Sequence, residues 1–508
     1  MLGPPKPRRL DRPVAASLEE LVPADHFYRH LDRVLDLAFV RDLVKDAYAE
    51  VGRPSIDPVI FFKVQLVMFF EGVRSERQLM RVVADRLSLR WYLGYALDEP
   101  LPDHSSLTRI RDRYGLAVFR RFFEAVVERC RAAGLVWGQE PFFDATKVGA
   151  NAALASTRPR FAVEAHLARL VAGQEPAPPG DGDAPAAAGP APLPVALTEE
   201  ARAELAAAAA QRQDWFGQAG RPGRGAARPR YRRLADFHAS PTDPDATPMQ
   251  RRGGGPCLGD HAHDVVDGGK ARIVLALLVT PAAVMENTPL RDLLWRACFR
   301  WKLRPRQVTG DTAYGTLENI VAIEDAGIRA DVPLPSGPHP KGIFRQDDFA
   351  YDPASDTDRC PAGQTLAFRG VKPGERVRVY QADEAACAPC QLRPRCATGR
   401  SSRRIHRSFD EAYLERVSAY HETEAYRKAM RKRAAWVEPL FAEAKAWHGL
   451  GRFRLRGLPK VNGEALLVAA GQNLKRLLSK RGWGRRPWPS GAAGLVLPAP
   501  SPAPTALG

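Results

Sequence analysis

The sequence predicts a mixed α/β protein in which an all-helical N-terminal domain precedes an α/β core that is interrupted by a small Cys-rich insertion. Helical periodicity runs through residues 23–134, strand and helix patterns alternate from residue 238 onward, and four of the seven cysteines fall between residues 360 and 396. The predicted domains are a basic flexible arm (1–22), a helical domain (23–138), the first part of the core (139–340), the Cys-rich insertion (341–405), the second part of the core (406–480) and a disordered tail (481–508).

The composition favours a nucleic-acid partner. The 508 residues include 75 Lys and Arg against 58 Asp and Glu, which gives a formal net charge of +17. Such an excess favours binding to a polyanion, and nucleic acid is the commonest one. An acidic membrane surface is the rival partner, but the sequence has no long basic amphipathic helix beside an exposed apolar face. The chain is long enough for about two to four domains.

No segment is predicted to enter a membrane. The longest apolar run, Ile273–Met285, is shorter than the roughly 18 residues that a span requires, and Pro281 interrupts it. The N-terminus has basic residues but lacks the apolar stretch of a signal peptide. Clustered cysteines are typical of a metal site in a reducing compartment rather than of a disulfide framework. We therefore expect a cytoplasmic protein that acts on DNA and has no membrane partner.

The N-terminal helices include a segment that favours DNA binding. Helical patterns fill residues 25–48 and 58–73, and Ser75 has the position of an N-cap for a third helix. In DHSSLTRIRDRYG, Asp103 or Ser105 could cap a short helix. Its inner face would consist of Leu107, Ile110 and Tyr114, and its outer face would carry Arg109 and Arg113. Short helices with a capped turn and a basic face resemble a helix-turn-helix arrangement, although a plain solvated face fits the same pattern.

Two aspartates follow apolar runs in the predicted core. FFDATKV is predicted as a buried strand that carries Asp144 near its end, unless the aspartate instead starts a turn. Further on, ARIVLALLVTPAA is predicted as a strand and PLRDLLWRACFRW as an amphipathic helix. The next segment, RQVTGDTAYGTLENIVAIEDAG, is predicted as a strand followed by Asp311 and then a helix. Another strand is predicted at IRADVPLP. Strand ends can converge on one point, so Asp144 and Asp311 could meet. Residues 173–197 are a low-complexity linker, followed by an Ala-rich helix at 198–213.

A late segment places an acid in a basic and aromatic field. Glu438 and Lys445 are seven residues apart and therefore share one face of a helix. The apolar stripe beside them consists of Val437, Leu440, Phe441 and Ala444, and the surrounding basic and aromatic residues are Arg431, Lys432, Arg433, Arg452, Arg454, Arg456, Lys460, Trp436, Trp447 and Phe453. Such a carboxylate suits a divalent metal held against a nucleic-acid phosphate, although a surface helix with ion pairs fits too. Because of Pro439, the helix either begins near Glu438 or kinks there.

The insertion carries a candidate zinc site. Its ligands would be Cys360, Cys387, Cys390 and Cys396, of which the middle two form a CxxC motif. Four thiolates bind Zn²⁺ tetrahedrally and leave no open position, so the site would be structural. The alternative is a set of unpaired buried cysteines. The remaining three cysteines are scattered and fit ordinary core or loop positions.

The motifs together resemble the DDE transposases of bacterial insertion sequences, over most of residues 20–480. PSIDPVIFFKVQLVMFFEGVRSERQL and LPDHSSLTRIRDR are similar to the helical N-terminal domain of that family. FFDATKVGANA resembles its first acidic motif, VTGDTAYGTLENI its second and RKRAAWVEPLFAEAKAWHGLGRFRLRGLPKV its third. A Cys-bearing insertion before the glutamate also occurs in one branch of these enzymes. One departure is Asp260, which lies in a strand where the family tends to have an aromatic residue.

The resemblance implies an RNase H-like core in which Asp144, Asp311 and Glu438 bind Mg²⁺ or Mn²⁺ as a catalytic triad. Water would cut the end of an insertion sequence, and the resulting 3′-OH would attack target DNA. The implied DNA contacts are Lys445 near the active site and the weaker candidates Arg433 and Tyr314. Further candidates for contact with DNA are the basic residues already named on the N-terminal helix face and in the late segment, Arg109, Arg113, Arg452 and Arg456. Partners would be terminal inverted repeats and target DNA, bound by at least a dimer. Two alternatives stay open: a degenerate transposase that binds DNA without cutting it, and an RNase H-like metal-dependent nuclease.

Overall fold

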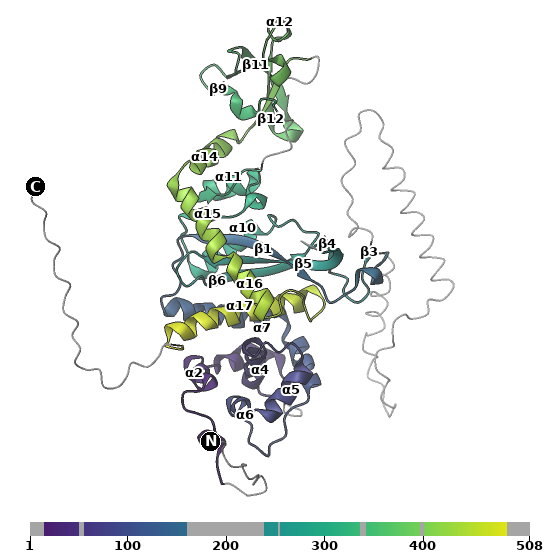
Figure 1. Cartoon of the computed structure of the whole chain (residues 1–508), viewed down its shortest axis with the longest axis vertical. Helices are drawn as coiled ribbons and strands as arrows, with labels where there is room; N and C mark the ends of the chain where they lie inside the picture. The colour runs from purple at the N-terminus through teal and green to yellow at the C-terminus, as the bar shows by residue number, and fades with distance from the viewer. Residues whose placement is uncertain are drawn as a thin grey trace, which may run out of the picture.

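The computed structural model describes residues 15–49, 55–159, 238–251, 254–335, 342–396 and 401–484 (Figure 1). The predicted linker at 173–197, the predicted Ala-rich helix at 198–213 and the tail from residue 485 onward lie outside these ranges. The described chain is a mixed α/β structure with a helical N-terminal region, a six-stranded sheet and a separate five-stranded sheet, which confirms the predicted class at that level. None of the described helices is long and apolar enough to cross a membrane.

The N-terminal region is helical, as predicted. Its elements are α1 (Leu18–Leu21), α2 (Phe27–Val34), α3 (Phe39–Val44), the 3₁₀ helix η1 (Lys45–Ala47), α4 (Pro58–Phe70), α5 (Glu76–Asp85), α6 (Leu87–Leu93) and α7 (His104–Ala132). Ser75 caps α5 as predicted, because its hydroxyl accepts from the Gln78 N–H at 3.3 Å. The helix α1 lies inside the arm that the sequence predicts to be flexible. A capping box closed by Ser17 and Glu20 explains why that part of the arm is folded.

Helix α7 is longer than the short helix that its sequence predicts. Asp103, rather than Ser105, is its N-cap and accepts from the Ser105 N–H at 2.8 Å. The helix continues for 29 residues through Gly115, where a φ of +62° kinks it without ending it. The predicted inner residues Leu107, Ile110 and Tyr114 are buried, and the predicted outer residues Arg109 and Arg113 are exposed.

The large sheet combines antiparallel and parallel pairs. Its strands are β1 (Pro141–Gly149), β4 (Thr247–Gln250), β5 (Pro256–Asp267), β6 (Val274–Pro281), β7 (Gln307–Thr309) and β8 (Arg329–Asp331). The strand β5 pairs antiparallel with β1 along one edge. Its other edge pairs antiparallel with β4 over residues 256–259 and with β6 over residues 260–266. The pairs β1–β7 and β7–β8 are parallel. The connections through α10 (Leu290–Trp301) and α11 (Leu317–Asp325) confirm the predicted alternation of strand and helix. Outside this sheet lie the 3₁₀ helix η2 (Leu154–Ser156) and the two-stranded pair β2 (Arg158–Pro159) and β3 (His238–Ala239).

Helix α17 (Leu458–Lys480) lies between the large sheet and α7 (Figure 1). Two of its side chains form hydrogen bonds with backbone groups at the edge of β6. Asn473 accepts from the Val274 N–H at 2.9 Å and donates to the Val274 carbonyl at 2.8 Å. Asn462 repeats this pattern on Val279, at 2.8 and 2.9 Å. Two amide side chains therefore take the place of a further strand, and a helix covers an edge that would otherwise be open to pairing.

One hydrophobic core joins the helical region to the large sheet. Buried side chains such as Phe122 of α7, Val265 of β5 and Leu474 of α17 belong to the same cluster. Trp301 at the end of α10 is also buried there, and its indole N–H donates to the Leu275 carbonyl at 2.9 Å. The helical region is therefore packed directly against the sheet, so the two cannot move independently without exposing apolar surface.

The Cys-rich insertion folds as a small antiparallel sheet at the far end of the molecule (Figure 1). Its strands are β9 (Ala350–Asp352), β10 (Thr357–Arg359), β11 (Thr365–Lys372), β12 (Val377–Ala382) and β13 (Arg404–Ser408), in that spatial order. The short helices are η5 (Gln346–Asp348), η6 (Pro373–Glu375), α12 (Glu384–Cys387) and α13 (Arg393–Cys396). The described residues of the insertion form a core of their own with five buried side chains. Helices α14 (Glu411–His421), α15 (Glu424–Trp436) and α16 (Glu438–Trp447) then run in succession back across the large sheet to α17.

Asp260 does not interrupt its strand. It lies within β5, opposite Val148 of β1, and is 2% exposed. Burial raises its pKa to about 8, and the nearby carboxylates of Asp243 and Asp245 raise it further in the same direction. The departure from the family pattern thus places a carboxyl group that favours its protonated form inside the fold.

We predict that Asp260→Asn stabilises the protein at high pH. The unfolded chain releases this proton near pH 4, whereas the folded protein holds it up to about pH 8. The carboxyl therefore lowers stability progressively as pH rises through that window, and an amide does not titrate. Chemical unfolding at pH 5, 7 and 9 should show the advantage of the variant growing by up to about 4 kcal/mol, because about three pH units of the window lie above pH 5 and each is worth about 1.4 kcal/mol. Asp98→Asn, at an exposed acid, is the control, and parallel pH profiles for wild type and Asp260→Asn would contradict the prediction.

Candidate active site

The parallel pairing of β1 and β7 brings Asp144 and Asp311 together. Phe142 lies opposite Thr309 in that pair, and each aspartate is two residues further along its own chain. Both carboxylates therefore reach the same level of the sheet, as the sequence predicts. Asp144 lies in the middle of β1 rather than near its end, because the strand continues to Gly149 along its partner β5.

A single guanidinium group lies between the two aspartates. Nη2 of Arg433 is 3.0 Å from Asp144 Oδ1 and 3.6 Å from Asp311 Oδ2. The side chains of Arg433 and Asp144 are 13% and 9% exposed, whereas that of Asp311 is 35% exposed. The other carboxylate oxygen of Asp311 accepts from the Ala313 N–H at 2.9 Å, because Asp311 caps the 3₁₀ helix η4 (Thr312–Tyr314). One cationic group is thus shared by two acids from neighbouring strands.

The electrostatics of Asp144 reflect competing influences. Burial raises its pKa to about 6, although Arg433 and the Ala145 N–H act in the opposite direction by stabilising the carboxylate. The negative charge of Asp311 contributes to the increase. A buried carboxylate beside a second one, with a cation between them, is an arrangement that favours binding of positive charge.

Two further acids lie close to this pair, and no motif in the sequence points to either of them. Asp264 of β5 is directly opposite Asp144 in the ladder, is fully buried, and has its pKa raised to about 8 by burial and by Asp144. Glu286, in the loop after β6, has a pKa raised by burial and by Asp311, and lies 3.7 Å from His261. Only the register of β5 on β1 could have identified Asp264, and the sequence does not specify that register.

Glu438 is the first residue of a new helix, which decides between the two possibilities raised by Pro439. The helix α15 ends at Trp436, and α16 begins at Glu438 with Pro439 in its first turn. The predicted apolar stripe Val437, Leu440, Phe441 and Ala444 is buried, and Glu438 and Lys445 are exposed. The Glu438 carboxylate makes no hydrogen bond or ion pair with any residue that the structure describes.

The three predicted acids are therefore only partly brought together. Asp144 and Asp311 share Arg433, and Glu438 does not join them. Within the described ranges, no group of three or more Asp, Glu, His or Cys side chains is placed to hold a metal ion. A divalent ion at Asp144 and Asp311 would require the guanidinium to leave, and a third carboxylate would have to approach.

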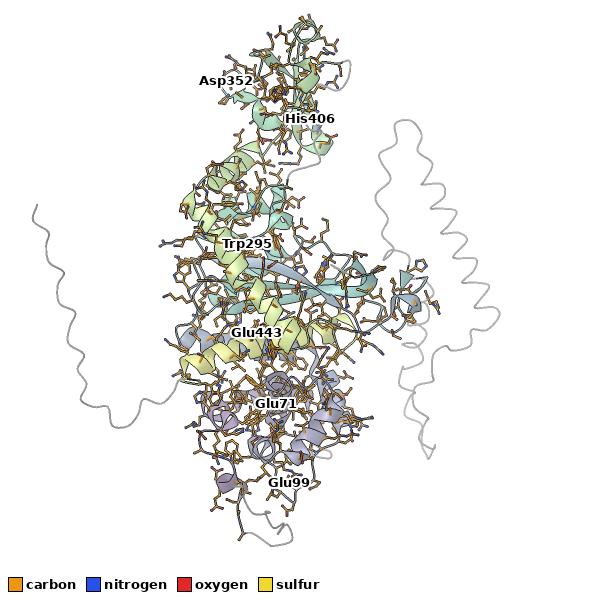
Figure 2. All side chains as sticks on the ribbon, viewed as in Figure 1. Glu71, Glu99, Trp295, Asp352, His406 and Glu443 are labelled. Carbon is orange, nitrogen blue, oxygen red and sulfur yellow. The ribbon has the colours of Figure 1, made fainter. Side chains whose placement is uncertain are left out.

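Glu443 anchors the second half of α16 to α17, where Figure 2 labels it. Its carboxylate accepts from Gln472 at 3.3 Å and from Lys475, and lies 3.5 Å from Arg476. Burial alone would raise the pKa of Glu443, but a hydrogen bond with His448 and the charges of Lys475 and Arg476 outweigh it and lower the pKa well below its usual range. The body of α16 is thus held firmly, while its first residue stays free.

Basic side chains surround the end of β1 beyond Asp144. Partial burial and Arg251 lower the pKa of Lys445, while the Asp144 carboxylate opposes this change, so Lys445 interacts with both groups. Gly149 leaves room for the Arg251 guanidinium, since a Cβ there would lie 1.7 Å from Nη2. Arg452 donates to the Ala150 carbonyl at 3.0 Å, and Arg456 donates to the Asn151 carbonyl at 2.9 Å.

Tyr314 does not fit the predicted contact with DNA. It is 1% exposed, and its ring packs against that of Phe143 on β1. Burial, followed by the charges of Asp144 and Asp311, raises its pKa well above the usual value, so its phenol stays neutral. Tyr314 therefore belongs to the hydrophobic core next to the two aspartates. Arg109 and Arg113 lie on α7 in the helical region, where Arg113 stacks on Tyr48 at 4.9 Å.

The four cysteines of the predicted zinc site line one small cavity of the insertion. The same cavity is bounded by Phe344, Leu366 and Arg403. Burial raises the pKa of Cys396, and the other three thiols raise it as well, while Arg403 opposes them. All seven cysteines are free thiols. The sequence thus identified cysteines that lie close together, yet they are not positioned as ligands of a bound metal.

Comparison with known families supports the motifs at both ends of the chain. Residues 16–113 match a transposase domain described as DUF772, and residues 359–478 match a transposase DDE domain. The predicted resemblance to insertion-sequence DDE transposases is confirmed. No curated protein and no solved structure matches the chain. The matched transposase domains include Glu438 and Lys445 but neither Asp144 nor Asp311, so the role of the aspartates rests on their motifs and on the geometry above.

Proposed function

We propose that this chain is a DDE transposase that cuts the ends of an insertion sequence and joins them to target DNA. The observation that carries the proposal is the meeting of Asp144 and Asp311, from two parallel strands, at one cationic group. The two transposase domain matches support it independently. In this proposal the large sheet is an RNase H-like core. The spatial order β6–β5–β1–β7–β8, with the first acid on the central strand, supports that assignment.

The donor set fits a hard divalent cation such as Mg²⁺ or Mn²⁺. Asp144 and Asp311 offer carboxylate oxygens from separate elements, and Arg433 already occupies their shared position as a stand-in cation. Glu438 would supply the third carboxylate after a local rearrangement. A divalent ion held by these carboxylates would supply Lewis-acid chemistry, which can activate the attacking oxygen and stabilise the leaving oxygen of a phosphodiester.

The protein's own residues would then hold the DNA. Lys445, Arg452 and Arg456 surround the end of β1 and would contact backbone phosphates next to the scissile bond. Arg109 and Arg113 would contribute from the helical region, which we propose as the DNA-binding domain for the terminal repeat.

In the first step of the proposed reaction, water forms a bond to phosphorus and the 3′ oxygen leaves as a hydroxyl. That 3′-OH then attacks a phosphodiester of target DNA, where its oxygen forms a bond to phosphorus while the target strand's own 3′ oxygen leaves as a hydroxyl, in an assembly of at least two copies.

We predict that Asp311→Ala abolishes cutting of a DNA fragment that carries the element's own end. Cleavage and joining would be measured in Mg²⁺ on labelled fragments, for wild type and variant. The rate should fall by about a thousandfold or more, because the variant loses one of the shared carboxylates. Asp292→Ala, at an exposed acid on α10, is the matched control and should cut normally.

Other outcomes separate the alternatives. If the wild-type protein binds the terminal-repeat duplex but never cuts it, the chain is a DNA-binding descendant of a transposase. Cutting without preference for that end, and without joining, would favour a general metal-dependent nuclease. Equal cutting by wild type and Asp311→Ala would place the active site elsewhere.

A structural zinc ion in the insertion is also our proposal. The four cysteines line one cavity, although their thiols would have to close around the ion to bind it. The described part of the insertion has a core of five buried side chains, and domains this small often gain stability from a metal or from disulfides. Elemental analysis of protein purified without chelators should find about one zinc per chain. Cys387→Ser combined with Cys390→Ser should remove it, and Cys257→Ser should not. Wild-type protein free of zinc would refute the proposal.

A further inference from the structure

We propose that Arg433 is an electrostatic latch that holds Asp144 and Asp311 in the metal-free protein and must withdraw before a divalent cation can bind both. The inference rests on the proposed function, because it concerns the same pair of acids. It assigns to Arg433 a role that differs from the DNA contact expected from sequence. The latch is the Arg433 side chain itself, which lies in the position expected for the metal.

The contacts of Arg433 fit a reversible latch. Its Nη2 serves both carboxylates, at 3.0 and 3.6 Å, while its buried Nε has no hydrogen-bond partner among the described residues. A guanidinium has five donors, and a permanent structural arginine usually satisfies them. Arg433 therefore neutralises two acids that would otherwise repel each other, but it keeps a buried donor unsatisfied. That imbalance favours replacement by a better cation.

The latch is linked by the chain to the missing third acid. Arg433 lies in the last turn of α15, and Glu438 is the first residue of α16. The junction between them is Val437, whose side chain is fully buried. Because Glu443 ties α16 to α17, a rearrangement at this junction would fall mainly on the end of α15 and the first residue of α16. Withdrawal of Arg433 and approach of Glu438 can thus occur in one local change.

Charge explains why the two cations exclude each other. A divalent ion bound to both aspartates would lie within a few ångströms of the guanidinium, and like charges at that separation repel strongly in a buried site. The other basic groups nearby do not fill this position, since Lys445 forms no ion pair with either aspartate in the described structure and Lys147 donates to the Gln250 carbonyl at 3.3 Å. Removal of the Arg433 charge should therefore favour metal binding directly.

The test measures binding of Mn²⁺ to the full chain without DNA, by electron paramagnetic resonance of free Mn²⁺ and by calorimetry. Arg433→Ala should bind Mn²⁺ on the order of tenfold more tightly than wild type, since a charge-assisted contact no longer competes. The metal-free variant should unfold at a lower temperature than wild type, and Mn²⁺ should raise that temperature by a larger amount. Arg427→Ala, at an exposed arginine of the same helix, should change neither quantity.

Two additional variants make the result decisive. Arg433→Lys keeps a charge but loses the planar fork, so it should fold if Arg433→Ala does not and should bind Mn²⁺ with intermediate affinity. Asp144→Asn combined with Asp311→Asn should abolish the binding. If the Arg433 variants bind Mn²⁺ through the two aspartates no more tightly than wild type does, the latch proposal is wrong and the proposed function is unaffected. Absence of any binding that depends on the two aspartates would overturn the proposed function itself.

Discussion

The parallel pairing of β1 and β7 is the constraint on which the candidate site depends. It brings two aspartates, 167 positions apart in the chain, to the same level of one sheet. The central position of β1 is secured by β5 on its other side and by the core that α17 and α7 share with the sheet. Because Asn462 and Asn473 close the edge of β6, the sheet ends there and its register is held. A slip of one residue would turn Asp144 to the opposite face.

The arrangement of charge follows from that constraint. Two neighbouring acids of which one is buried need a cation, and Arg433 supplies it in this structure. Further along β1, Lys445, Arg251 and Arg452 present positive charge towards solvent, where a DNA backbone would lie. A negative centre with a positive rim is the distribution that a metal-dependent enzyme acting on DNA requires. The insertion lies far from this centre and is connected to it through α14 and α15 (Figures 1 and 2).

Much of the fold could be predicted because its signals are local. The apolar runs of α4 and β6, the amphipathic pattern of α10 and the Ser75 cap depend on residues a few positions apart, whereas the sequence left Asp103 and Ser105 as alternative caps of α7. The length of α7 could not, because tertiary packing carries the helix through Gly115. The pairing of Asp264 with Asp144 and the contacts of Arg433 are non-local and need the three-dimensional register. Sequence motifs gave the two aspartates, whereas the burial of Tyr314 and the free carboxylate of Glu438 emerged only from packing.

The most direct test of this account is to locate Mn²⁺ by anomalous scattering in crystals of the protein bound to its terminal-repeat DNA. The account predicts a Mn²⁺ peak roughly 2.0–2.3 Å from carboxylate oxygens of both Asp144 and Asp311, with the Arg433 guanidinium displaced and Glu438 turned towards the ion. A structure in which Mn²⁺ binds elsewhere, while Arg433 stays between the two aspartates on DNA, would contradict it.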